Sequence, residues 1–75
     1  MTKNIHTVFN SDRGMWENKH EGHGPPLSSH HTKENAMEKG RKIAGERKVE
    51  HLIHGKNGKI HERNSYGNDP FPPPG

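Results

Sequence analysis

Hydrophobic and polar residues alternate near the start of the chain. Between residues 4 and 9, Ile5, Thr7 and Phe9 share one face of an extended segment. This two-residue period, carried by β-branched and aromatic side chains, predicts a strand. A cluster rich in Asn, Ser, Asp and Gly follows and predicts a tight turn. Residues 15–19 then read as a second strand, so we expect a hairpin at the start of the chain.

The middle of the chain predicts a loop and then one helix. Residues 20–29 contain two glycines and a proline pair, which predict a loop. The helix opens at Thr32, whose hydroxyl can cap the first turn. A narrow apolar stripe then recurs at helical spacing, formed by Ala36, Gly40, Ile43, Ala44 and Arg47, with Met37 beside them. Glycine costs about 1 kcal/mol relative to alanine in a helix. We therefore expect that Gly40 lets the helix lie close to a sheet.

The second half of the chain predicts another pair of strands. Residues 49–54 are rich in apolar and β-branched side chains and read as a strand. The Asn57-Gly58 pair that follows favours a two-residue type I′ hairpin, with a further strand beginning at residue 60. In that register Lys56 lies directly opposite Lys59.

Together these elements predict one small α+β domain. We expect a short antiparallel sheet of three or four strands in the order β-β-α-β-β, with the helix packed on one face. Residues 1–64 form the compact domain, and residues 65–75 form an extended proline-rich tail.

Composition limits what so small a domain can do. Leu, Ile, Val and Phe number 10 of 75 residues, so the core is thin, and we expect Trp16 to lie in it. This leaves little room for a deep catalytic cleft, and we expect no enzymatic activity. There is no cysteine to form a disulfide or a thiolate metal site. The sequence shows no apolar run long enough to span a membrane and no apolar stretch typical of a secretion signal, so we expect a cytoplasmic protein.

Several short motifs occur in a recognisable order along the chain. They are Asn4-Ile5-His6, Gly14-x-Trp16, Thr32-x-x-x-Ala36, Ile53-His54-Gly55-Lys56-Asn57-Gly58-Lys59-Ile60 and the ending Ser65-Tyr66-Gly67-Asn68-Asp69-Pro70-Phe71-Pro72-Pro73-Pro74-Gly75. In this order the chain resembles a small bacterial and phage family, domain of unknown function number 2188. The resemblance implies a compact β-β-α-β-β unit and implies no catalytic residue or substrate. The chain departs from the family where Glu17-Asn18 replaces an expected apolar pair.

The charge balance favours a binding role. Twelve Lys and Arg against nine Asp and Glu give a net charge of +3, and eight histidines would raise it toward +11 in acid. We expect a non-enzymatic basic module that contacts nucleic-acid phosphates. The candidate contacts are Lys56 and Lys59 at the hairpin tip and Arg41, Lys42, Arg47 and Lys48 along the helix.

A protein partner is the alternative. A small interaction factor of phage origin would dock on a host protein through its open sheet face or its proline-rich tail. The tail residues for such a contact are Tyr66, Phe71, Pro72 and Pro73. A third interpretation is that Tyr66 and Phe71 fold back to cover the sheet.

The histidines raise the question of a metal. In the expected hairpin register His54 lies opposite His61, at a separation that could hold one transition-metal ion. No cysteine or fixed carboxylate completes a tetrahedral set. We therefore expect neither a functional metal site nor a cofactor.

Overall fold

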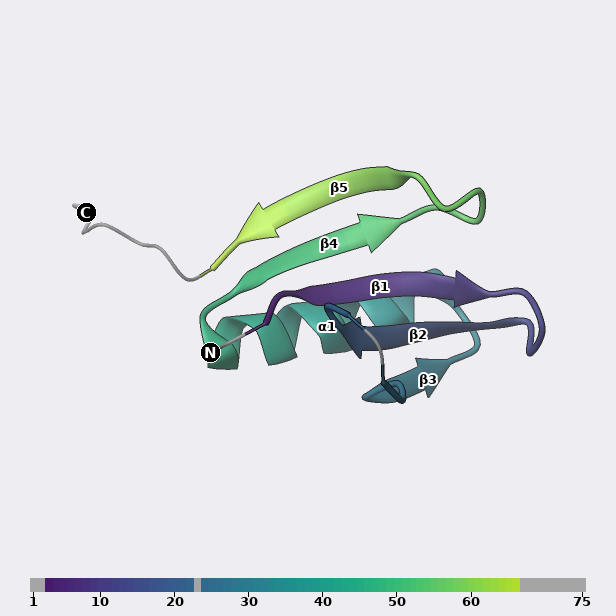
Figure 1. Ribbon diagram of the computed structural model, residues 1–75, viewed down its shortest axis with the longest axis horizontal. Coiled ribbons are helices and arrows are strands. Elements are labelled where there is room, and N and C mark those ends of the chain that lie inside the picture. Colours follow the sequence, from purple (N-terminus) through teal and green to yellow (C-terminus); the bar gives the residue numbers. More distant parts are fainter. Residues whose placement is uncertain (1–2, 23, 67–75) are drawn as a thin grey trace.

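The computed structural model describes residues 3–22 and 24–66, which form five strands and one helix (Figure 1). In chain order the elements are β1 (Ile5–Asn10), β2 (Met15–His20), β3 (Ser28–His30), α1 (Lys33–Arg47), β4 (Glu50–His54) and β5 (Ile60–Ser65). The predicted α+β class is confirmed, with one helix packed on one face of the sheet.

The sheet has the strand order β3-β2-β1-β4-β5, which places β1 at its centre. β1 and β4 run parallel, whereas the other three neighbouring pairs run antiparallel. The prediction of a purely antiparallel sheet is therefore wrong. Because α1 runs back along the sheet, the chain re-enters it at the end where β1 begins (Figure 1). Two strands that start at the same end of a sheet are parallel, and a crossover helix is the usual connection between them.

β3 is a strand where the sequence predicts only loop, and it brings the sheet to five strands rather than three or four. It pairs with β2 in the register Trp16 to His30 and Asn18 to Ser28. The backbone N–H of Leu27 adds a hydrogen bond of 2.6 Å to the carbonyl of Asn18. Serine has little strand propensity, so pairing with β2 decides the conformation here.

α1 begins and ends where its capping residues place it. The Thr32 hydroxyl accepts a hydrogen bond of 3.2 Å from the N–H of Asn35, which confirms the predicted N-cap. Lys48 closes the helix in the left-handed conformation, with φ of 57°, and its N–H bonds to the Ala44 carbonyl. Gly40 is buried against the sheet, where an added Cβ would lie 2.9 Å or less from three side-chain atoms. The predicted close approach is therefore confirmed.

The core lies between α1 and the sheet. Its central cluster is Ile5, Ala44 and Val49, and Ile43 and Tyr66 pack against that cluster. Tyr66 therefore lies against the core, as the fold-back interpretation of the tail expects. The other predicted partner-binding residues of the tail lie outside the described residues; they are Phe71, Pro72 and Pro73.

The only tryptophan of the chain is a core side chain. Trp16 is 6% exposed, and its ring centroid lies 5.1 Å from that of Phe9 on the neighbouring strand. Lys33 places its ammonium 5.3 Å from the Trp16 ring centroid, and Lys56 places its own 4.9 Å from the Phe9 ring centroid. Two cation–π contacts thus cover this end of the core.

The β4–β5 hairpin is present, but its turn differs from the prediction. The N–H of Gly55 bonds to the Lys59 carbonyl at 2.8 Å, and the N–H of Gly58 bonds to the Gly55 carbonyl at 2.9 Å. Type I′ geometry needs positive φ at both central residues, whereas Gly58 has φ of 87° and Asn57 does not have positive φ. A three-residue loop with a left-handed glycine is formed instead. Lys59 therefore lies opposite Gly55, and the predicted Lys56–Lys59 pair is wrong.

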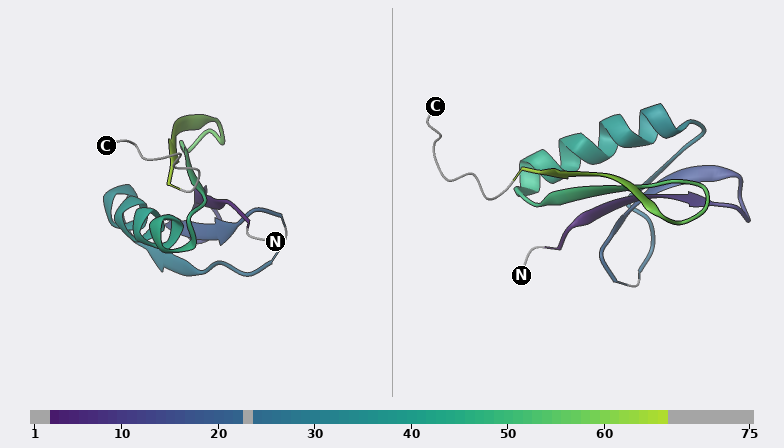
Figure 2. Two further views of the ribbon diagram at one scale, coloured as in Figure 1. Left: turned by 90° about the vertical axis from the view of Figure 1, so that its left-hand side faces the viewer. Right: turned by 90° about the horizontal axis from the view of Figure 1, so that it is seen from above.

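The two faces of the sheet are covered differently. α1 packs on β1, β2, β3 and β4 but does not reach β5. Figure 2 shows residues 24–27 looping out on the face away from α1. In the part of the chain that the structure describes, no helix is long and apolar enough to cross a membrane.

Candidate functional site

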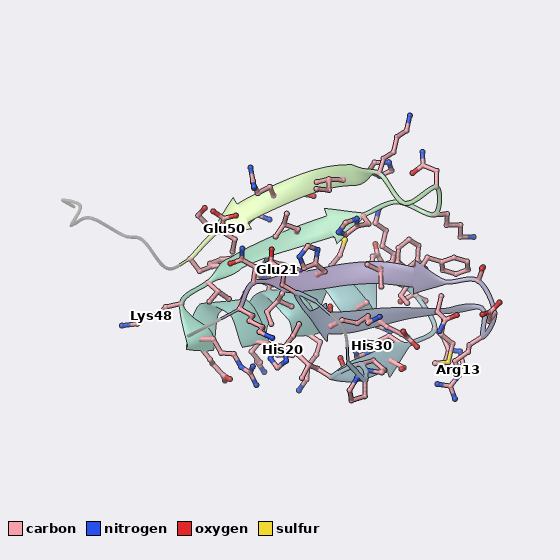
Figure 3. The ribbon with its side chains drawn as sticks, in the orientation of Figure 1. Arg13, His20, Glu21, His30, Lys48 and Glu50 are labelled. Atoms are coloured by element: carbon pink, nitrogen blue, oxygen red, sulfur yellow. The ribbon has the colours of Figure 1, made fainter. Side chains whose placement is uncertain are left out.

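The six predicted phosphate contacts do not lie together, because two are on the β4–β5 hairpin and four are spread from the middle of α1 to its C-terminal cap. Lys56 and Lys59 lie on the β4–β5 hairpin, beside the first turn of the helix, where Lys33 Nζ lies 3.5 Å from His61 Nδ1. Lys48 closes the opposite end of the helix (Figure 3). The 15 residues of α1 span about 22 Å. The hairpin lysines and the end of the helix therefore do not form one contiguous surface.

One side of α1 is basic and borders β3. A hollow of about 280 Å³ is lined there by His30, Asn35, Glu38, Lys39 and Lys42. Farther along the helix, Arg47 donates a hydrogen bond to the His20 ring of β2. We call Lys39, Lys42, Arg47 and Lys48 the basic side of α1. Within residues 3–22 and 24–66, the one ion pair joins Arg63 to Glu50 at 3.2 Å, so these four cations have no carboxylate partner there.

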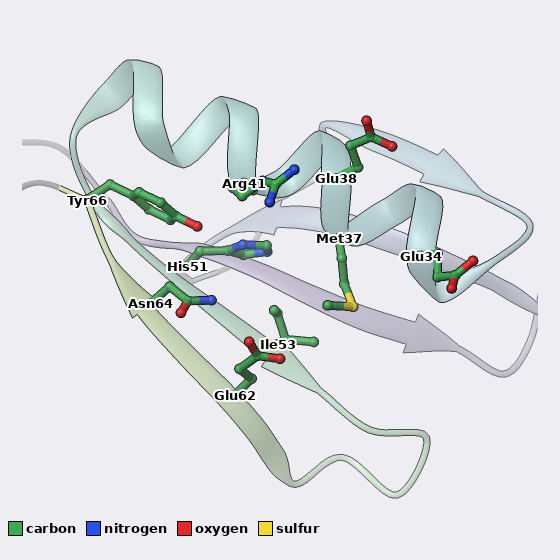
Figure 4. Close-up of a pocket in the computed structure, with 9 residues that line it drawn as sticks. All are labelled: Glu34, Met37, Glu38, Arg41, His51, Ile53, Glu62, Asn64 and Tyr66. Carbon is green, nitrogen blue, oxygen red and sulfur yellow. The ribbon is translucent and has the colours of Figure 1, made fainter.

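The other side of α1 borders an acidic groove. Because the helix does not reach β5, a cavity of about 360 Å³ opens between them (Figure 4). We call it the α1–β5 groove. Its lining residues are Glu34, Met37, Glu38 and Arg41 from α1, His51 and Ile53 from β4, Glu62 and Asn64 from β5, and Tyr66. Three glutamates and one arginine line the groove, so its formal charge is negative although the chain carries a net charge of +3. Arg41 thus lines this groove, whereas Lys42 lines the hollow beside β3.

A buried polar network lies beneath Gly40. Thr7 is fully buried, and its Oγ1 lies 2.6 Å from both Asn18 Oδ1 and His51 Nε2. Asn18 is also fully buried and donates from Nδ2 to the Ala36 carbonyl at 2.9 Å. The network therefore joins β1, β2 and β4 to the helix in place of apolar packing.

The hydrogen bonds of this network place a proton on Nε2 of His51. A carbonyl only accepts, so the contact with Ala36 fixes Nδ2 of Asn18 as the donor and turns Oδ1 toward Thr7. The single hydroxyl proton of Thr7 then goes to Asn18, and Thr7 Oγ1 accepts from Nε2–H of His51. His51 Nδ1 is left as a bare acceptor. It is buried and has no hydrogen-bond partner.

Burial also controls the charge of His51. The side chain is 1% exposed, and this desolvation lowers its pKa below the ordinary value of 6.5. The Glu62 carboxylate opposes the shift, whereas Arg41 and His6 add to it. His51 is therefore a neutral acceptor at pH 7, at the floor of the α1–β5 groove.

A second histidine network lies on the sheet face away from α1. His54 Nδ1 donates to the Gly58 carbonyl at 3.2 Å, which leaves its Nε2 to accept from His6 Nδ1–H at 2.9 Å. The two ring centroids lie 5.1 Å apart. Desolvation and the nearby His54 lower the pKa of His6, against an opposing effect of Glu21. This face therefore holds a hydrogen-bonded imidazole pair.

The predicted His54–His61 pair is wrong, because a register shift between Ile53 and His54 places Ile60 opposite His54. The His61 ring instead covers Gly55, where an added Cβ would lie 2.2 Å from it. In the described part of the chain, no group of three His, Asp or Glu side chains is placed to hold a metal ion.

The sequence carries only a partial signal for the buried network. Thr7 and Asn18 occupy positions that face α1, and Gly40 indicates close contact of helix and sheet. Polar residues at such positions are usually read as solvent-facing, so the pattern alone does not assign them to the interior.

Comparison with known proteins gives one family match. No curated protein and no solved structure matches the chain. A family model matches residues 5–66, which run from the start of β1 through β5 to Tyr66 and make up most of the chain. The resemblance seen in the sequence motifs is confirmed. The chain belongs to DUF2188, a family described as uncharacterized protein conserved in bacteria.

Proposed function

We propose that this protein is a non-enzymatic nucleic-acid-binding module that contacts phosphates through the basic side of α1. The observation that carries the proposal is the placement of Lys39 and Lys42 around one hollow, with Arg47 and Lys48 continuing along the helix. Phosphate contacts of this kind position a nucleic acid without reading its sequence.

The surroundings of the basic side support this assignment. All four of its cations are exposed, and none pairs with a carboxylate among the described residues. His20 and His30 lie beside them on β2 and β3. Binding that relies on such contacts weakens as salt rises, because each neutralised phosphate releases counterions.

The hairpin lysines are not part of this surface. Lys56 packs over Phe9, and both Lys56 and Lys59 lie beside the opposite end of the helix. They supply the matched control, because their removal changes the net charge by the same amount.

The test measures affinity for a labelled duplex and a labelled single strand by fluorescence anisotropy over a salt series. Three proteins are compared: the wild type, the double variant Lys39→Gln, Lys42→Gln and the double variant Lys56→Gln, Lys59→Gln. We expect the helix variant to lose about two units of the duplex salt slope, at about 0.9 per contact. The hairpin variant keeps the wild-type slope. Absence of binding at low salt, or equal losses in both variants, contradicts the proposal.

A second candidate is recognition of a protein strand by β5. β5 lies at the edge of the sheet, and Ile60, which is 54% exposed, begins it. An exposed edge can add a strand from a partner. Such binding depends on backbone hydrogen bonds, so insensitivity of the interaction to salt would favour it over phosphate contact.

A further inference from the structure

One residue that lines the α1–β5 groove, His51, has a ring nitrogen without a hydrogen-bond partner. His51 is 1% exposed, its Nε2 is bonded to Thr7, and its Nδ1 is buried and unpaired. Leaving a buried acceptor unpaired is unfavourable, because the hydrogen bond it makes to water in the unfolded chain is not replaced. His51 also lines the groove, and Figure 4 shows its ring between α1 and β5. A ligand in the groove that donates a hydrogen bond to Nδ1 recovers this cost.

Two further acceptors lie beside His51 on the same face of the hairpin. Asn64 is directly opposite His51 in the β4–β5 register, and Glu62 is the next residue of β5 on that face. Directly opposed Cβ atoms lie about 4.5–5.5 Å apart, and diagonal ones are within reach of long side chains. We propose that the groove binds an alkylammonium group, with His51 Nδ1, the Asn64 amide oxygen and the Glu62 carboxylate as its acceptors. An ammonium carries three N–H donors, which match three acceptors.

The groove also suits the carbon chain that carries an ammonium. Met37 and Ile53 line it and offer apolar surface to methylene groups. Its volume is about 360 Å³, whereas one water takes about 30 Å³, so the groove is larger than one bridging water needs. A short alkyl chain with a polar end can therefore contact Met37 and Ile53 while its end reaches His51.

The charge of the groove favours a cation. Glu34, Glu38 and Glu62 outnumber Arg41, so an anionic ligand would meet net repulsion. Arg41 is the single cation in the lining and opposes an ammonium. The proposal therefore gives two substitutions opposite signs: removing the charge of Glu62 weakens binding, and removing that of Arg41 strengthens it.

The experiment titrates the ¹⁵N-labelled full chain with 1,5-diaminopentane and follows amide and imidazole nitrogen shifts. We expect saturable changes at His51, Asn64 and Glu62, including the Nδ1 resonance of His51. Glu62 is exposed and its ion pair is screened by solvent, so Glu62→Gln weakens binding by about two- to fivefold. Arg41→Gln tightens it. Both residues are exposed, and the amide spectrum of each variant verifies the fold.

The control is Glu46→Gln, which removes the same charge from an exposed part of α1 outside the groove. Unchanged binding in this variant supports the proposal. Equal weakening by Glu46→Gln and Glu62→Gln, or shifts that do not saturate, means general attraction of cations and overturns it. An unmoved His51 Nδ1 resonance also overturns it.

Two further arms identify the source of the ammonium. The first uses a lysine whose amino and carboxyl groups are blocked, which represents a lysine side chain of a partner protein. The second uses the same compound acetylated at Nζ, which removes the charge and must not bind. Tighter binding of the blocked lysine than of the free diamine assigns the site to a protein partner, and the reverse assigns it to free amines. The two proposals can be tested separately. Removing a cation weakens binding of phosphates, whereas Arg41→Gln removes a cation and tightens binding of the ammonium.

Discussion

Gly40 offers a direct test of how α1 is held on the sheet. Replacing it by alanine adds a Cβ that would lie 2.6 Å from Asn18 Oδ1, 2.6 Å from His51 Nε2 and 2.9 Å from Thr7 Oγ1. Carbon contacts are favourable only at about 3.5–4.0 Å, so the helix or the network must move. All three atoms belong to the buried hydrogen-bond network, so the movement breaks bonds as well as packing.

The net effect follows from three magnitudes. Alanine improves the helix by about 1 kcal/mol. Overpacking costs about 1–3 kcal/mol, and a buried polar group left unpaired costs about 1–3 kcal/mol. The free energy of unfolding of Gly40→Ala should therefore fall by about 1–5 kcal/mol. A chain of 75 residues has about 4–11 kcal/mol in total, so the loss is large.

Gly45 in the same helix supplies the matched control. It is exposed, and an added Cβ there meets nothing within 4 Å. Gly45→Ala should therefore raise the free energy of unfolding by about 0.5–1 kcal/mol. Urea denaturation followed by far-ultraviolet circular dichroism and by fluorescence of the buried Trp16 measures both variants. If Gly40→Ala is as stable as Gly45→Ala, the close contact between helix and sheet is refuted.

Three other predictions concern the same network and the helix cap. Thr7→Val leaves Asn18 Oδ1 and His51 Nε2–H unpaired and should lower the free energy of unfolding by about 2–4 kcal/mol; a loss below that of a single hydrogen bond would contradict the assigned donors. Thr32→Ala removes the N-cap and should cost about 1 kcal/mol in the same urea assay, and no loss would argue against the cap. Burial lowers the pKa of His51 and of His6 below 6.5, so the unfolded chain binds more protons as pH falls. The stability is therefore complete above pH 6.5 and declines as pH falls below it, and urea midpoints that do not change between neutral and mildly acidic buffers would contradict this.

Local signals in the sequence predict the elements that local contacts hold. The Thr32 cap and the first hairpin are confirmed, because each depends on residues near one another in the chain. The Gly40 approach is also confirmed, although its partners on the sheet are distant in the sequence; there the missing side chain itself is the local signal. The parallel pairing of β1 with β4 and the existence of β3 depend on partners far away along the chain. No periodicity within Ser28–His30 predicts a strand, since β2 supplies the pairing.

The site illustrates the same limit. Arg41 and Lys42 are neighbours in the sequence, so the sequence predicts that they share one basic surface. In the structure Arg41 lines the α1–β5 groove, whereas Lys42 lines the hollow on the basic side of α1. Near the turn the predicted hairpin register is wrong by one residue, because Gly58 alone takes positive φ; beyond the register shift, Ile53 lies opposite Glu62, as the predicted turn also requires. Nothing in the sequence distinguishes His51 from the other seven histidines. Only its hydrogen bond to buried Thr7, which is in turn bonded to Asn18, leaves Nδ1 of His51 as an acceptor.

The proposed function is tested most directly by mapping a bound oligonucleotide on the ¹⁵N-labelled protein. We predict that amide shifts concentrate at Lys39, Lys42 and Arg47 and grow smaller as salt is raised. Shifts confined to the hairpin around Lys56, or shifts along β5, would contradict a phosphate-binding surface on the basic side of α1.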